Sequence, residues 1–167
     1  PQADPTLRPD SLKLIGFYTT ENQYTFLAGP DLYFDSGFYH VQLAGVVSHT
    51  PSTFWGVGES AGDGDDDEEY TQSAWGFHLE TTAEVAGPFR AGLLAEIQDV
   101  DLSDTETGGR VESGALTGGD GGREVGVGPL LAWDDRDSAF WPTRGGYHRV
   151  SVRRFADALG SEYDYTL

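Results

Sequence analysis

The stretch FHLETTAEV, Phe77–Val85, divides into two alternating sets of residues that differ in polarity. One alternate set is apolar or small (Phe77, Leu79, Thr81, Ala83, Val85), and the other is polar (His78, Glu80, Thr82, Glu84). A period of two places successive side chains on opposite faces of a β-strand, whereas a helix would need a period near 3.6. The stretch therefore predicts a strand with one apolar face and one charged face.

The same alternation recurs along the chain and predicts about eight strands, at 12–19, 23–33, 38–48, 70–84, 89–101, 123–134, 146–156 and 161–167. Pro129 lies inside one of them, and proline usually marks a strand edge or a bulge. Residues 1–10 carry three prolines and indicate an extended arm. We therefore predict an arm at 1–10 and one all-β domain at 11–167, folded as an antiparallel meander.

The connections between these strands alternate in length. Short links lie near 20–22, 35–37 and 86–88, and long polar ones span 50–70 and 102–122. Long loops at one end and short turns at the other are typical of transmembrane β-barrels. Aromatic residues near the expected strand ends suit the two membrane interfaces: Trp55, Trp75, Trp133, Trp141, Tyr33, Tyr70 and Tyr147.

Composition and spacing disfavour several other classes of protein. A net charge of −18 argues against nucleic-acid binding, which needs basic residues. The chain has no cysteine, and its four histidines lack zinc-site spacing. The acidic run GDGDDDEE at 62–69 lacks the ligand order of an EF-hand. We expect no enzymatic activity, no cofactor and no metal.

The segment WDDRDSAFWPTRGGYHRV, 133–150, concentrates aspartates, arginines, a proline and a glycine pair. Such carboxylates can perform acid–base chemistry or hold a metal, but a turn fixed by an Arg–Asp pair explains the same residues. We favour the turn.

This segment also resembles the barrel motif of the BamA/TamA-type outer-membrane assembly family, the bacterial surface antigens. The matching residues are Asp134, Arg136, Asp137, Phe140, Pro142, Thr143, Gly145 and Tyr147. GPDLYFDSG at 29–37 and STFWGVGES at 52–60 are weaker likenesses. The resemblance implies the N-terminal half of a sixteen-stranded barrel and a role in membrane-protein assembly or translocation. The family's later Val/Ile-Arg-Gly-Phe/Tyr motif is absent.

In a membrane barrel, the charged face of each strand and its apolar face would lie in different environments. We expect one set to line a wet lumen: Glu80, Glu84, Arg90, Glu96, Arg149 and Arg153. We expect the other to face lipid: Phe77, Leu79, Leu93, Ile97, Val125, Val127, Leu131, Val150 and Val152. Changes at Glu80 or Glu96 should then be mild, and Leu93→Arg or Val127→Arg costly.

The expected location is the bacterial outer membrane. The expected partners are outer-membrane lipid, the remaining barrel strands or another copy of the chain, and, by resemblance alone, client outer-membrane proteins. The alternative is a soluble all-β binding module whose acidic loops bind a cation or a ligand, because alternation alone does not identify the solvent.

Overall fold

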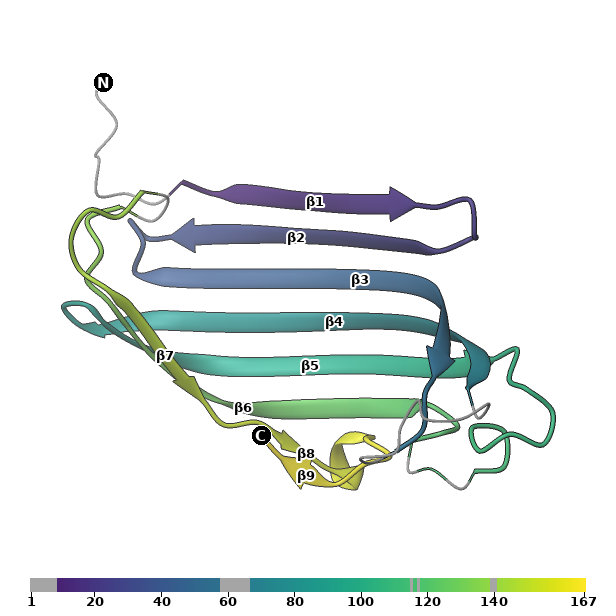
Figure 1. Ribbon diagram of the computed structural model, residues 1–167. Coiled ribbons are helices and arrows are strands. Elements are labelled where there is room, and N and C mark those ends of the chain that lie inside the picture. Colours follow the sequence, from purple (N-terminus) through teal and green to yellow (C-terminus); the bar gives the residue numbers. More distant parts are fainter. Residues whose placement is uncertain (1–8, 58–66, 115, 117, 139–140) are drawn as a thin grey trace.

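The computed structural model describes residues 9–57, 67–114, 116, 118–138 and 141–167. It contains one antiparallel sheet of nine strands in chain order (Figure 1). The strands are β1 (Ser11–Tyr18), β2 (Tyr24–Phe34), β3 (Tyr39–Phe54), β4 (Glu68–Ala86), β5 (Phe89–Ser103), β6 (Gly122–Asp134), β7 (Tyr147–Ser151), β8 (Arg154–Phe155) and β9 (Tyr165–Thr166). The predicted all-β antiparallel meander is confirmed.

The sheet is open. Its order runs from β1 at one edge to β8 and β9 at the other, and these edges do not pair within the described part of the chain. The described residues therefore do not close into a barrel by themselves. Of the predicted arm, only residues 9 and 10 are described, and the carboxylate of Asp10 accepts a hydrogen bond from the Tyr33 N–H at 2.7 Å.

The predicted strand 146–156 is divided into β7 and β8. Both pair with β6 in one continuous register, with Leu130 opposite Ser151 and Gly126 opposite Phe155. Between them the Val152 N–H donates to the Pro129 carbonyl at 3.2 Å, and proline has no N–H to return the bond. Pro129 thus interrupts the hydrogen-bond ladder at the gap between β7 and β8, whereas β6, which contains it, remains one continuous strand.

Other boundaries differ at the long-loop end of the sheet. β3 and β4 pair as far as Phe54 and Glu68, so the loop predicted at 50–70 shortens to 55–67. The predicted last strand, 161–167, is reduced to β9, and a 3-10 turn at Asp157–Leu159 precedes it. At the other end, Asp35 and Ser36 both have positive φ, which matches the tight turn that joins β2 to β3.

The register separates the side chains onto two faces, which we call inner and outer. Across β3 to β6 the outer face carries the aligned residues Gly45, Phe77, Ile97 and Val125. The inner face carries the row Gln42, Glu80, Leu94 and Gly128. The few buried apolar side chains of the strands lie on the inner face: Leu94, Leu130, Ala132 and Phe155.

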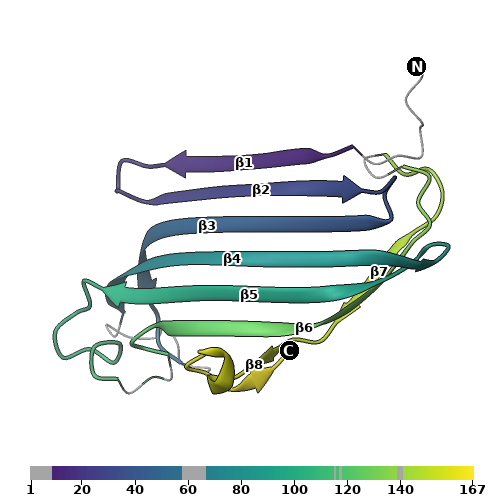
Figure 2. The ribbon, with the colours of Figure 1, turned by 180° about the vertical axis from the view of Figure 1, so that it is seen from behind.

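The sheet curls around its inner face. Figures 1 and 2 show this one sheet from opposite sides, and in both views β7 runs diagonally across the ends of β4 and β5. Between Glu124 and Asp134, the inner-face residues of β6 are small or apolar: Gly126, Gly128, Leu130 and Ala132. A Cβ at Gly128 would lie 1.7 Å from the Val152 carbonyl oxygen, so only glycine fits this close approach.

Candidate functional site

Ion pairs cross the inner face from one strand to strands that are not its neighbours. Arg149 of β7 reaches Glu80 of β4 at 2.8 Å, and Arg153 reaches Glu96 of β5 at 2.6 Å. Strands three positions apart in a flat sheet would be about 14 Å apart. The first contact therefore requires the inner face to be concave, and the small side chains of β6 leave room for both arginines.

Glu80 is less accessible than a residue lining a wet channel would be. The residue is 3% exposed, although 35% of the Arg149 side chain reaches solvent. The interaction between the two side chains is an ion pair without a hydrogen bond, because the Glu80 Oε2 accepts none from the described residues. Removing Arg149 would leave the buried Glu80 without its partner, whereas removing Glu80 would leave an arginine that solvent still reaches. The mild effect expected for a change at Glu80 itself stays a prediction.

A polar cavity of about 450 Å³ occupies the short-turn end of the inner face. Asp31 of β2 lies 2.6 Å from the Nε2 of His40, and the His40 ring stacks on Tyr33 at 4.4 Å. Arg90 donates to the Thr82 hydroxyl at 3.2 Å and to the Phe38 carbonyl at 2.8 Å. Glu84 also lines this cavity. Acidic and basic groups are interleaved here, so the cavity has no surface of a single charge.

The segment between β6 and β7 is a pinned turn. Arg136 donates to both carboxylate oxygens of Asp134, each at 2.9 Å, and its guanidinium lies 4.8 Å from the centre of the Tyr147 ring. Asp137 accepts from the backbone N–H groups of Thr143 and Arg144 at 2.9 and 3.2 Å. These bonds, with the Thr143 hydroxyl, lower the pKa of the Asp137 carboxyl.

The remaining motif residues belong to the same turn. Gly145 has φ +81° and lies so close to the Asp135 carbonyl that a Cβ would come within 2.1 Å of its oxygen. Pro142 follows the exposed Trp141, and Phe140 lies outside the described residues. Among the described residues, no group of three or more His, Asp or Glu side chains is placed to hold a metal ion. The geometry matches the turn interpretation of this segment.

Glu68, which belongs to the acidic run at 62–69, anchors the second long loop. Glu68 accepts hydrogen bonds from the backbone N–H groups of Arg110 and Val111 at 2.8 and 2.9 Å. These bonds lower the pKa of the Glu68 carboxyl. Gly109 passes so close that a Cβ would lie 2.5 Å from the Glu68 Oε2. Residues 62–66 of the acidic run lie outside the described residues.

The outer face is apolar and open. All nine residues expected to face lipid lie on it and are exposed or half-buried; Leu93 is 64% exposed and Phe77 54%. Aromatic residues gather at both of its ends: Phe89 and Trp133 contact edge to face at one, and Tyr18 stacks on Tyr24 at the other. Tyr33 and Tyr147, predicted for such belts, instead line the inner cavity.

Within the described residues, no helix has the length and apolar character needed to cross a membrane. Comparison with known proteins returned no matching family, no matching curated protein and no matching solved structure.

Proposed function

We propose that this chain is a membrane-spanning β-sheet, part of an outer-membrane barrel whose outer face contacts lipid and whose inner face lines a polar interior. The observation that carries the proposal is the inverted exposure of the two faces. Leu93 and Phe77 are more than half exposed, whereas Glu80 and Thr82 are 3% and 5% exposed. Soluble sheets bury the apolar face and hydrate the charged one.

The dimensions of the outer face support the proposal. The apolar stretch runs from Phe89 to Ile97 on β5 and from Val125 to Trp133 on β6. Each stretch corresponds to about 26 Å of strand at 3.3 Å per residue, and about 9–11 residues suffice for a tilted membrane strand. The salt-bridged Asp99 and Arg123, 2.8 Å apart, lie just beyond the long-loop end of this band.

The chain contains no cysteine, so single introduced cysteines can test the proposal directly. Spin labels at Leu93→Cys and Gln98→Cys lie on opposite faces of β5, and both positions are exposed. In lipid vesicles we expect the Leu93 label to collide with oxygen dissolved in lipid and the Gln98 label to collide with a water-soluble nickel chelate. A folded monomer in detergent-free buffer, with both labels equally accessible to the chelate, would instead establish the soluble binding module.

A role in assembling or translocating other outer-membrane proteins is the narrower proposal, supported by the resemblance of the turn motif. It predicts that vesicles containing this protein accelerate the folding of a second outer-membrane barrel. Vesicles containing an Asp137→Ala, Thr143→Ala variant, which lacks the bonds that pin the turn, are the matched control. Equal folding rates with wild type, variant and empty vesicles would contradict the assembly role and leave the membrane proposal standing.

A further inference from the structure

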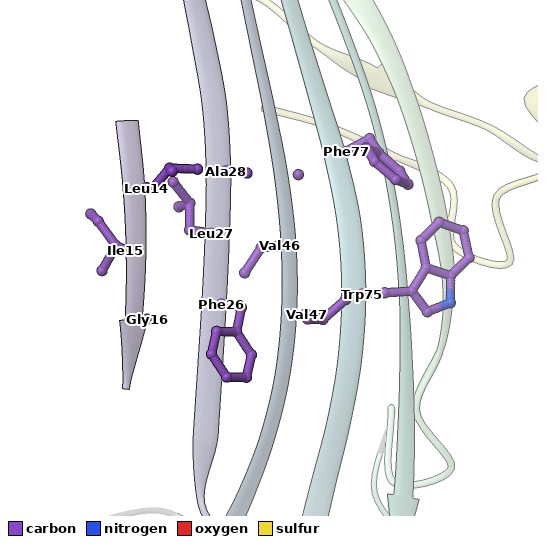
Figure 3. A pocket seen from close by; sticks show the side chains of 11 residues that line it. Leu14, Ile15, Gly16, Phe26, Leu27, Ala28, Val46, Val47, Trp75 and Phe77 are labelled. Atoms are coloured by element: carbon purple, nitrogen blue, oxygen red, sulfur yellow. The ribbon is translucent and has the colours of Figure 1, made fainter. Parts of the chain in front are cut away.

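The outer face contains an apolar groove of about 500 Å³ across β1 to β4. Figure 3 shows Phe26 and Ala28 on β2 at one side and Trp75 and Phe77 on β4 at the other, with Val46 and Val47 of β3 between them. The hollow exists because the residues beneath the aromatic rings are small: a Cβ at Gly16 would lie 2.7 Å from the Phe26 ring, and one at Gly45 3.0 Å from the Phe77 ring. Each of the two rings therefore lies against a glycine.

A polar row of residues lies beyond one end of this groove. The next outer row toward the long loops consists of Tyr18, Tyr24, His49 and Ser73. His49 stacks on Tyr24 at 5.4 Å and lies 3.0 Å from the Ser73 hydroxyl. A second apolar hollow, lined by Leu79, Leu93 and Val127, lies within the apolar band at mid-strand. The first groove thus has an apolar length, with a polar, aromatic row beyond one end.

We propose that this groove binds one acyl chain of a membrane lipid, with the lipid's polar portion beside Tyr24, His49 and Ser73. The inference rests on the proposed membrane function and adds a specific lipid site to it. The occupant is an amphiphile because the surface is amphiphilic, and the groove is continuous with the apolar band on the same face. Tyrosine and histidine rings, apolar in body and polar at one edge, suit the level at which a lipid passes from chain to headgroup.

The test uses Trp75, which lines the groove, as the reporter. In the full-length chain, Trp55, Trp133 and Trp141 are changed to Phe, and the protein is reconstituted in phospholipid vesicles with brominated acyl chains, which quench tryptophan fluorescence. A second protein keeps only Trp133, at the opposite end of the outer face. Both are then transferred into bromine-free detergent, and the quenching that persists is measured.

We expect Trp75 to retain most of its quenching after transfer, because the bound chain stays in the groove, and Trp133 to lose nearly all of it. Ala28→Phe fills the groove and should abolish the retention. Ala91→Phe adds the same ring to the outer face of β5 and should not. Mass spectrometry of the detergent complex should detect one retained lipid with Ala91→Phe and none with Ala28→Phe.

Two outcomes overturn the inference in different ways. If both tryptophans are quenched in vesicles and both recover in detergent, no specific lipid site exists, while the proposed membrane function stands. If neither tryptophan is quenched in vesicles, the outer face does not contact lipid, and the proposed function fails together with the site. Retention that survives Ala28→Phe also overturns the inference, because the chain would then be held elsewhere.

Discussion

The two faces of β4 differ in what stabilises them. On the outer face Phe77 and Leu79 are exposed. On the inner face Glu80 and Thr82 are buried, and Glu80 forms an ion pair that crosses two intervening strands. The inner face is therefore organised by specific charge contacts, and the outer face depends on the medium around it. Each face should respond to a different perturbation.

The largest effect is expected on the inner face. Arg149→Ala leaves the buried Glu80 without its partner and should cost about 3 kcal/mol, the lower end of the range for breaking a buried pair. Glu80→Ala leaves Arg149, whose side chain is 35% exposed and can be hydrated, and should cost less. The free energy of unfolding, measured by urea titration in the same detergent or vesicle for every variant, checks this.

The double variant Glu80→Ala, Arg149→Ala is the informative comparison. It should cost clearly less than the two single changes together, since it removes both charges. Glu84→Ala, at an exposed position on the same face, should stay within about 0.5 kcal/mol. Additive single effects would show that the pair does not stabilise the curled sheet.

A smaller but more decisive effect is expected on the outer face. Leu93→Arg and Val127→Arg should each destabilise the vesicle-inserted protein by about 2–4 kcal/mol if the residues lie near mid-bilayer. In water, the same change at an exposed position costs within about 0.5 kcal/mol. Gln98→Arg, exposed on the inner face of β5, is the matched control. Equal small effects at all three positions would remove the distinction between the faces.

The strands and their two faces could be predicted from the sequence, because a period of two depends only on local backbone geometry. FHLETTAEV therefore predicted β4 and its alternating faces. An Arg–Asp pair was expected in the turn at 133–150, and the structure shows that the pair is Arg136 with Asp134. Alternation does not indicate how deeply each side chain is buried. That Glu80 is buried follows from curvature, which depends on the small residues of β6 and on contacts between strands far apart in sequence.

The gap between β7 and β8 and the role of Glu68 each depend on residues elsewhere in the sequence. The gap between β7 and β8 arises from Pro129 on the adjacent strand, so the pattern of 146–156 alone gives no sign of it. Glu68 looked like one carboxylate among many, and its partners are backbone N–H groups some forty residues away. The nearby Gly108–Gly109 pair is the only local hint, since it permits the close approach.

The mildest perturbation, acid, should act on the charged contacts and spare the apolar ones. Hydrogen bonds to the charged form lower the pKa of Glu68 at the long-loop end and of Asp137 at the short-turn end. A lowered folded pKa contributes stability above the ordinary carboxyl values of 4.5 and 3.8, and that stability is lost as pH falls through the folded values. The protection of the Arg110, Val111 and Thr143 amides, measured as exchange relative to the intrinsic rate at each pH, should therefore fall below these ordinary carboxyl values before that of the strands. Glu68→Gln should give fast exchange at Arg110 and Val111 already at neutral pH and leave Thr143 unchanged. Simultaneous loosening of both ends in that variant would mean that the loops do not open independently, and that the charged contacts act as one unit with the sheet.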